Sequence, residues 1–241
     1  MALTPSSPFG YPATMPKTQE PEPLYRDFCW KCRRPSSLCL CPTESPMMTR
    51  TRIVLLMHPM EWKRERCATG RLTCLNLENS EIIPGLSFEH NPRYRALVDD
   101  PANYPMLLYP GKEAYDLSTG GFPAGQLGSR RLVIFLIDAT WSCARIILRE
   151  SPCLLTLPCV KFTPSAPSQF IIKRQPAPHC LSTIEATHEL LLALEGSGLD
   201  TYPDKDRLLN TFFAMRDYQL DRIQSDNNPR RRLDKTKTDT R

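Results

Sequence analysis

Four cysteines lie within thirteen residues near the start of the chain, in the sequence FCWKCRRPSSLCLCP. Their C-x2-C-x6-C-x-C spacing can close a tetrahedral shell of thiolates around Zn²⁺. The segment is too short for a hydrophobic core, so the metal would supply its folding free energy. Free surface thiols do not explain so dense a cluster, and a redox-active C-x2-C pair would need a βαβ context that is missing here. We therefore predict a zinc knuckle over residues 24–46, with Cys29, Cys32, Cys39 and Cys41 as its ligands.

Aromatic and basic residues alternate with these cysteines: Trp30, Lys31, Arg33 and Arg34. Such side chains would give the knuckle a face that could touch RNA, by base stacking and by contact with phosphates. A second basic segment, residues 226–241, holds six Lys or Arg against three Asp, which is +3 of the net +5 of the chain. This tail suits contact with a phosphate backbone, and a solvated flexible end explains it equally well.

The segment RLVIFLIDATWSCARIIL, residues 131–148, changes character after an apolar run. Residues 132–137 are apolar and rich in β-branched types, which predicts a strand buried on both faces. Asp138, Thr140 and Trp141 follow at once. A carboxylate at the buried end of a strand can act as a general base. The structural alternatives are that Asp138 caps the following helix and that Trp141 is core packing.

Apolar strands alternate with helical segments over the rest of the chain. We expect strands at 52–57, 81–83, 105–111 and 131–137, with further strand-like segments at 153–157 and 169–173. We expect a helical segment at 61–77 interrupted by Gly70, a turn or short helix at 91–100, and helices at 142–150, 182–195 and 204–224. This alternation predicts an α/β fold with a mostly parallel sheet.

Ligands of such sheets bind beyond the carboxyl ends of the strands. Three of the expected strands lead there into polar residues, namely His58, Tyr109 with Gly111, and Asp138. A hydrogen-bonded ring at the end of a strand explains His58 as well as a functional role does. Neither G-x-G-x-x-G nor G-x4-G-K-[ST] occurs, so a nucleotide-type cofactor would have to be held in another way.

Proline is roughly twice as frequent as in an average protein, with 24 in 241 residues, and six of these lie in the first 23. We expect residues 1–23 to be a disordered leader. There is neither a signal-peptide pattern nor an apolar run long enough for a membrane helix, so we expect a soluble, cytoplasmic protein without disulfides. The expected organisation is a leader at 1–23, the zinc knuckle at 24–46, an α/β domain at 47–225 and a basic tail at 226–241.

Taken together, these residues resemble the DTW-domain family, named for D-x-T-W, which stands here as Asp138-Ala139-Thr140-Trp141. The resemblance runs from about Cys29 to about Glu195. It includes the four cysteines, HPME at 58–61, TG at 69–70, LYPG at 108–111 and LSTIEA at 181–186. Several motifs in order are far more specific than the tetrapeptide alone.

The resemblance implies a tRNA-uridine aminocarboxypropyltransferase, which transfers the 3-amino-3-carboxypropyl group of S-adenosylmethionine to N3 of a uridine in tRNA. It also implies a fold near the SPOUT-type α/β-knot proteins, with helices on both faces of the sheet and a carboxyl-terminal knot that holds the cofactor. The expected partners are tRNA and S-adenosylmethionine, without DNA or membrane. An RNA methyltransferase of the same fold is the second hypothesis, because the carbon attacked at the sulfonium is chosen by geometry. A zinc-dependent RNA-binding protein without activity is the third.

Each residue type suits a step of that reaction. Asp138, as a buried carboxylate with a raised pKa, would take the proton from uridine N3. Thr140 would orient that carboxylate or bond a uracil carbonyl, and Trp141 would stack on the base or wall the cofactor pocket. The helix start at Ser182 offers N–H groups to the cofactor carboxylate and Glu185 could hold its ammonium, although an S-x-x-E capping box alone accounts for both residues. The predicted cofactor-binding residues are Tyr109, Pro110, Gly111, Ser182, Thr183 and Glu185.

Overall fold

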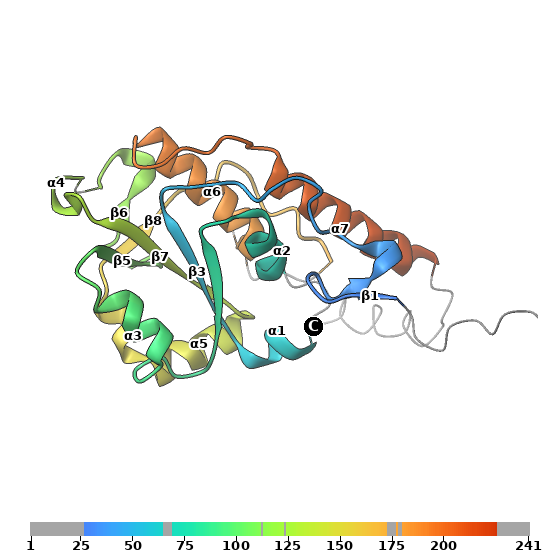
Figure 1. Ribbon diagram of the computed structural model, residues 1–241, viewed down its shortest axis with the longest axis horizontal. Helices are drawn as coiled ribbons and strands as arrows, with labels where there is room; N and C mark the ends of the chain where they lie inside the picture. Colours follow the sequence, from blue (N-terminus) through green and yellow to red (C-terminus); the bar gives the residue numbers. More distant parts are fainter. Residues whose placement is uncertain are drawn as a thin grey trace, which may run out of the picture.

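The computed structural model describes residues 27–64, 69–111, 113–122, 124–172, 177 and 180–225. The leader predicted at 1–23 and the tail predicted at 226–241 lie outside these residues. A sheet in the strand order β4-β3-β7-β5-β8-β6 forms the centre (Figure 1). Its strands are β3 (Arg52–Met57), β4 (Ser80–Pro84), β5 (Asn103–Leu108), β6 (Tyr115–Asp116), β7 (Arg131–Asp138) and β8 (Cys159–Lys161). All pairings between them are parallel, which confirms the predicted α/β class.

Helices cover both faces of this sheet, as predicted (Figure 1). One layer holds α2 (Thr69–Asn76), α6 (Thr183–Gly196) and α7 (Arg207–Ser225), which contact one another. The other holds α3 (Pro92–Val98) and α5 (Trp141–Glu150). The shorter helices are α1 (Pro59–Arg64), α4 (Ala124–Leu127) and the 3₁₀ turns η1 (Ser36–Leu38), η2 (Leu117–Thr119) and η3 (Pro152–Thr156). The helices predicted at 91–100, 142–150, 182–195 and 204–224 are thus confirmed within a few residues.

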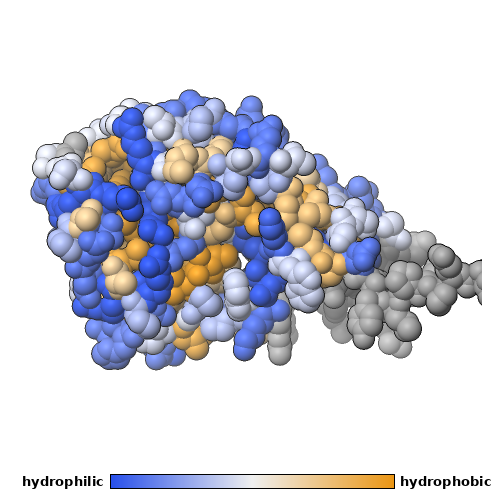
Figure 2. All heavy atoms as spheres, in the orientation of Figure 1, coloured by the Kyte–Doolittle hydropathy of each residue, from blue (hydrophilic) through white to orange (hydrophobic). Residues whose placement is uncertain are grey.

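Strand β7 shows why the sheet needs a layer on each side. Leu132, Ile134 and Leu136 belong to the core shared with α6 and α7, whereas Val133 and Phe135 belong to the core on the other face. Successive side chains of a strand point to opposite faces, and here both sets are apolar. Hydrophilic residues cover much of the molecular surface and frame an apolar area over β3 and β7 (Figure 2).

The four-cysteine segment forms a small unit against the same core. Its strands β1 (Phe28–Cys29) and β2 (Arg34–Pro35) pair in antiparallel fashion, and η1 follows. Buried Cys32 is part of the core cluster that includes α2, α6 and α7, and Leu40 packs against it. Arg207 of α7 donates to the carbonyl of Ser45 at 2.7 Å. The segment is therefore packed onto the α/β layer structure.

Two predicted strands are wrong. The segment at 153–157 lies in the 3₁₀ turn η3, because Pro152 at its first position fixes a backbone angle suited to a helical turn. Residues 169–172 form no strand either, and Lys173 lies outside the described residues. The sheet position beside β5 belongs to β8, whose three residues are too short to produce an apolar pattern. The segment predicted at 61–77 divides into α1 and α2.

The knot stays a prediction. The connection between β8 and α6 includes residues 173–176 and 178–179, which lie outside the described part of the chain. Among the described residues, no helix has both the length and the apolar character that crossing a membrane requires.

Candidate active site

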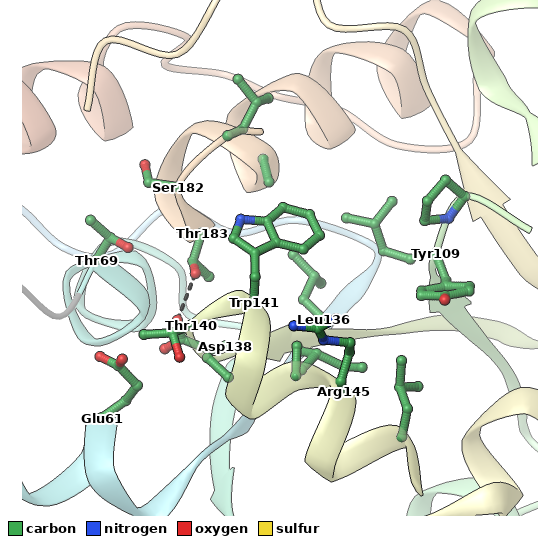
Figure 3. Close-up of a pocket in the computed structure, with 18 of the residues that line it drawn as sticks. Glu61, Thr69, Tyr109, Leu136, Asp138, Thr140, Trp141, Arg145, Ser182 and Thr183 are labelled. Carbon is green, nitrogen blue, oxygen red and sulfur yellow. Dashed lines mark hydrogen bonds between the residues drawn. The ribbon is translucent and has the colours of Figure 1, made fainter. Parts of the chain in front are cut away.

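A pocket of about 410 Å³ lies where β5 and β7 end (Figure 3). Its volume is within the range of sites for small molecules. Asp138 at the end of β7 pairs in register with Met57 of β3, so the HPME motif begins beside it. Seven of the nine predicted catalytic and cofactor-binding residues line the pocket, namely Tyr109, Pro110, Asp138, Thr140, Trp141, Ser182 and Thr183. Gly111 and Glu185 do not.

Asp138 lies on the floor of this pocket and is 7% exposed. Its Oδ1 accepts a hydrogen bond of 2.6 Å from the hydroxyl of Thr183 in the first turn of α6 (Figure 3). Its backbone carbonyl accepts from the N–H of His58 at 3.1 Å. Segments distant in sequence therefore hold the backbone and the carboxylate of Asp138 in place.

Gly70 in α2 makes room for this carboxylate. A Cβ atom at Gly70 would lie 2.0 Å from Oδ2 of Asp138 and 3.0 Å from Cδ1 of Leu55, well inside van der Waals contact. Any side chain here would displace Asp138 or the helix. The TG pair at 69–70 thus has a physical reason, because Thr69 lines the pocket and Gly70 lets α2 approach the end of β7.

Thr140 and Trp141 begin helix α5. Thr140 is the N-cap residue, and its hydroxyl accepts from the N–H of Cys143 at 3.4 Å. Asp138 is therefore not the cap of α5. Trp141 is 55% exposed rather than packed in the core, and its indole lies beside the pocket (Figure 3). Both structural alternatives for these residues are wrong.

Ser182 and Glu185 form the predicted capping box at the start of α6. The Glu185 carboxylate accepts from the N–H of Ser182 at 2.8 Å. It also accepts from the N–H of Gln169 at 2.6 Å and the hydroxyl of Ser168 at 2.9 Å. Glu185 therefore ties the 168–169 segment to α6, and this segment leads to Phe170 in the pocket wall. A contact between Glu185 and the cofactor stays a prediction.

His58 has a structural task as well. Its Nδ1 accepts from the N–H of Met60 at 3.2 Å, and its carbonyl accepts from the N–H of Trp62 at 3.0 Å in α1. The ring is buried and does not line the pocket. The predicted hydrogen-bonded ring at the end of a strand is confirmed.

Two charged residues of the pocket were missed as site residues. Glu61 of α1 and Arg145 of α5 line it together with Asp138, and these three are the charged groups among its lining residues (Figure 3). Arg145 stands one helical turn after Trp141, so both side chains share a face of α5. The four-residue spacing from Trp141 could have identified Arg145 in the sequence. Glu61 stood in the HPME motif, but nothing else in the sequence marked it as a site residue.

A stack of three side chains adjoins Asp138. The guanidinium groups of Arg33 and Arg71 each lie 4.5 Å from the centroid of a Trp62 ring, and both donate to the carbonyl of Trp62. Burial and the charge of Arg33 lower the pKa of Arg71, while the charge of Asp138 acts in the opposite direction. Sequence patterns gave no sign of this stack. It connects the cysteine segment to α1 and α2, the helices that carry Glu61, Thr69 and Gly70.

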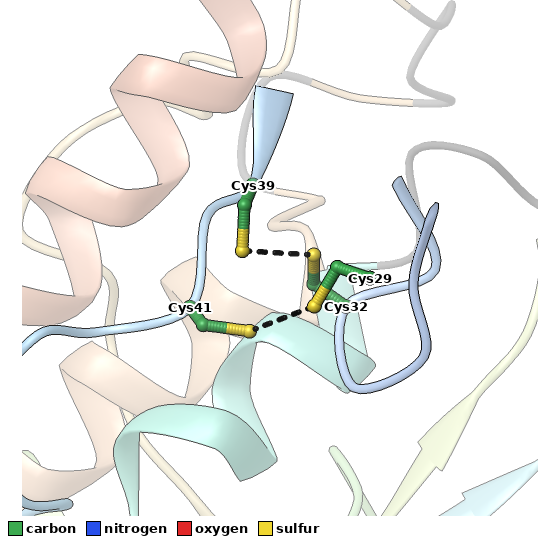
Figure 4. Close-up of side chains that lie close together, drawn as sticks. All are labelled: Cys29, Cys32, Cys39 and Cys41. Carbon is green, nitrogen blue, oxygen red and sulfur yellow. Dashed lines mark hydrogen bonds between the residues drawn. The ribbon is translucent and has the colours of Figure 1, made fainter. Parts of the chain in front are cut away.

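The four cysteines of the knuckle converge, and their sulfur atoms all lie within 4.8 Å of one another (Figure 4). The Sγ atoms of Cys29 and Cys41 are 3.6 Å apart, and those of Cys32 and Cys39 are 3.7 Å apart. A tetrahedral zinc site with Zn–S bonds of about 2.3 Å places its sulfurs about 3.8 Å apart. These residues therefore fit a zinc ion.

The thiols differ in how readily they ionise. A hydrogen bond from the backbone of Cys32 is the main reason why the pKa of Cys29 is lowered to about 6. Burial raises the pKa of Cys41, and its neighbouring thiols act in the same direction. Four thiolates would repel one another without a counter-charge, and a divalent cation supplies that charge.

Comparison with known proteins places this geometry in a family. The family model described as "DTW domain" matches residues 26–220. A Drosophila melanogaster protein named tRNA-uridine aminocarboxypropyltransferase 2 is 32% identical over 207 residues, covering 83% of this chain and 77% of its own. Its Mus musculus namesake is 30% identical over 81% of this chain and 64% of its own, and tRNA-uridine aminocarboxypropyltransferase A of Arabidopsis thaliana is 28% identical over 72% and 74%. No solved structure matches significantly. The chain belongs to the DTW-domain family.

Proposed function

We propose that this protein transfers the 3-amino-3-carboxypropyl group of S-adenosylmethionine to N3 of a uridine in tRNA. The names of the relatives support this reaction. The observation that carries the proposal is Asp138, a buried carboxylate held by Thr183 on the floor of a pocket beside an exposed Trp141. A carboxylate so placed can act as a general base next to a planar ring that stacks on a pyrimidine.

Asp138 would serve the acceptor side of the reaction. Uridine N3 is an imide nitrogen and a poor nucleophile until it loses its proton. The proton passes to a carboxylate oxygen of Asp138 as N3 forms its bond to the γ-carbon of the methionine chain. The bond between that carbon and sulfur breaks, and its electron pair stays on sulfur in neutral 5′-methylthioadenosine. Thr183 acts as a positioning residue, since its hydroxyl donates to Oδ1 of Asp138.

The pocket also has groups for the cofactor. The positively charged sulfonium and ammonium groups of the cofactor would bind near the carboxylates of Glu61 and Asp138. The carboxylate of its methionine chain would bind Arg145 or the N–H groups at the start of α6. Ser182 and Thr183 stand at that helix start. Tyr109 and Pro110, at the end of β5, offer an apolar wall for adenosine.

The zinc ion would be structural. Four cysteine thiolates leave no open coordination position, which is typical of zinc sites without a catalytic role. Cys29, Cys32, Cys39 and Cys41 would hold the metal, and the metal would stabilise a segment that has few core residues of its own. The cytoplasm is a suitable compartment, because it keeps such thiols reduced.

The products distinguish this function from methyl transfer. Purified protein incubated with S-adenosylmethionine and deacylated tRNA should release 5′-methylthioadenosine, and label in the cofactor carboxyl carbon should move to the RNA. Label in the methyl group should not move. Release of S-adenosylhomocysteine with methylated uridine would identify an RNA methyltransferase instead. Retained RNA binding with no turnover of the cofactor would identify a protein that only binds RNA.

A further inference from the structure

Two aromatic side chains stand exposed on the knuckle. Trp30 is 86% exposed and Phe28 is 40% exposed, and their ring centroids are 5.4 Å apart in an edge-to-face arrangement. Tryptophan is one of the more buried residue types on average. Aromatic rings stabilise a fold mainly when they are buried, so an exposed pair contributes little to the stability of the protein. At this exposure the Trp30 ring adds little to the packing of the described part of the knuckle beyond its contact with Phe28.

The backbone turn that carries Trp30 is closed by a hydrogen bond. Trp30 lies between two converging cysteines, Cys29 and Cys32, and the N–H of Arg33 donates to the carbonyl of Cys29 at 2.8 Å. Arg33 has a left-handed backbone conformation with φ of 57°, which closes the turn tightly. The guanidinium of Arg33 then donates to the carbonyl of Trp62 at 2.8 Å.

This connection leads directly to the pocket. Trp62 follows Glu61, which lines the pocket, and the Trp62 ring is stacked between Arg33 and Arg71. Trp30 is three residues from Arg33, a span of about 10 Å at most in an extended chain. The turn that carries Trp30 is therefore connected through Arg33 and Trp62 to the helix that carries Glu61 of the pocket.

The charge of this face is lower than the sequence suggested. Arg34 is buried, and Arg33 directs its guanidinium to Trp62. Arg33 is itself exposed, however, and Lys31 stays exposed beside the rings. The face therefore offers aromatic rings for stacking together with some positive charge.

The exposed aromatic area is small for a protein partner and suits a nucleobase. Two aromatic side chains at these exposures present roughly 300 Å². A stable protein partner or a second copy of the chain needs about 800 Å² on each side. One unpaired nucleobase fits the area of one or two rings, and stacking on aromatic side chains is how proteins hold bases splayed out of RNA loops.

We propose that Phe28 and Trp30 form a stacking platform for an unpaired base of the tRNA, close to the uridine that enters the pocket. The inference rests on the proposed function for the identity of the RNA. The platform holds the loop that carries the target while Asp138 acts on the uridine. It would contribute to RNA affinity and to the choice of substrate without touching the cofactor.

The test measures binding of deacylated tRNA to the zinc-loaded full-length protein at two salt concentrations. Trp30→Ala should weaken binding roughly 5- to 150-fold, the usual worth of one stacked base. The loss should be nearly the same at both salt concentrations, since stacking involves no counterion release. Trp30→Phe should retain most of the affinity. Leu155→Ala is the matched control, because Leu155 is an exposed apolar residue (53%) on the distant turn η3.

Zinc content and the thermal unfolding midpoint of each variant show that the knuckle is intact. Wild-type affinity in Trp30→Ala would overturn the platform, and so would a loss that disappears at high salt. A dimer of the wild-type protein that dissociates on Trp30→Ala would show that the rings serve a protein interface instead. Failure of the proposed function is a separate result, because it is measured by the adenosine product and leaves RNA binding unaffected.

Discussion

Replacing Gly70 by alanine tests whether the approach of α2 sets the position of Asp138. On helix propensity alone, alanine within a helix stabilises by about 0.5–1 kcal/mol relative to glycine. Here the new Cβ would lie 2.0 Å from Oδ2 of Asp138, whereas ordinary contacts begin at 3.4 Å. With α2 held in place, the carboxylate must move by about 1.4 Å, the difference between these two distances. Such a shift breaks its 2.6 Å hydrogen bond from Thr183.

The magnitude follows from these terms. A hydrogen bond to a charged group contributes about 1.5–3 kcal/mol, so after the gain in helix propensity the net destabilisation is about 0.5–2.5 kcal/mol. For a chain of this size the unfolding midpoint should fall by about 1–10 °C. A misplacement of about 1 Å at a reacting group lowers turnover by about 10²-fold. The variant should therefore show a large fall in turnover and only a small fall in its unfolding midpoint.

The assay pairs thermal unfolding with the rate of carboxyl-label transfer from S-adenosylmethionine to tRNA. Gly196→Ala is the matched control, because Gly196 is also helical and a Cβ there would meet nothing within 4 Å. The control should be as active as the wild type and equally stable or slightly more so. A Gly70→Ala protein that is stabilised and fully active would refute the reasoning.

Three further predictions concern other parts of the molecule. Thr183→Val should lower transfer roughly 10- to 150-fold by removing the hydrogen bond to Asp138, whereas Thr183→Ser should stay near wild type, and equal rates in both would contradict the positioning role. Replacing Cys29 and Cys32 by Ser should abolish a zinc content of about one per chain and lower the unfolding midpoint, with Cys159→Ser as control, and a metal-free, fully active wild type would exclude the zinc site. Burial lowers the pKa of His188 in the folded protein below its ordinary 6.5. As the pH falls, the histidine is therefore protonated in the unfolded chain before it is protonated in the folded one. Its contribution to the free energy of unfolding is complete above pH 6.5 and is lost as the pH falls through the folded-state pKa. Urea unfolding at pH 7.5 and 5.5 should show a smaller acid loss in His188→Gln, and an unchanged loss would exclude this group.

The sequence predicted the fold well where a pattern was long. β7 is a long apolar run and α6 a long helical segment, and both formed as expected. The errors are at short elements. β8 has only three residues. In the segment 153–157, the preceding Pro152 favours a helical turn although the residues that follow are mostly apolar. Tertiary pairing with β5 decides the position of β8, and no local pattern reports it.

The sequence likewise predicted some residues of the site and missed the contacts between them. Motifs pointed to Asp138 and Trp141 and to the start of α6, because polar residues that interrupt apolar runs are visible in a sequence. The partners of Asp138 were not visible as partners, since Thr183 and Gly70 reach it only after α6 and α2 pack against the sheet. The stack of Arg33, Trp62 and Arg71 requires three separate segments to meet and has no signature in any of them.

The most direct test of the central claim is the rate of aminocarboxypropyl transfer in Asp138→Asn, measured in a single turnover beside the affinity for S-adenosylmethionine. Asparagine keeps the shape of the side chain and removes the base. Transfer should fall by about 10²–10⁴-fold, the usual contribution of a general base, while cofactor affinity stays close to wild type. Transfer at the wild-type rate would contradict the role of this carboxylate, and a loss of cofactor binding would show that Asp138 shapes the pocket instead of acting on the uridine.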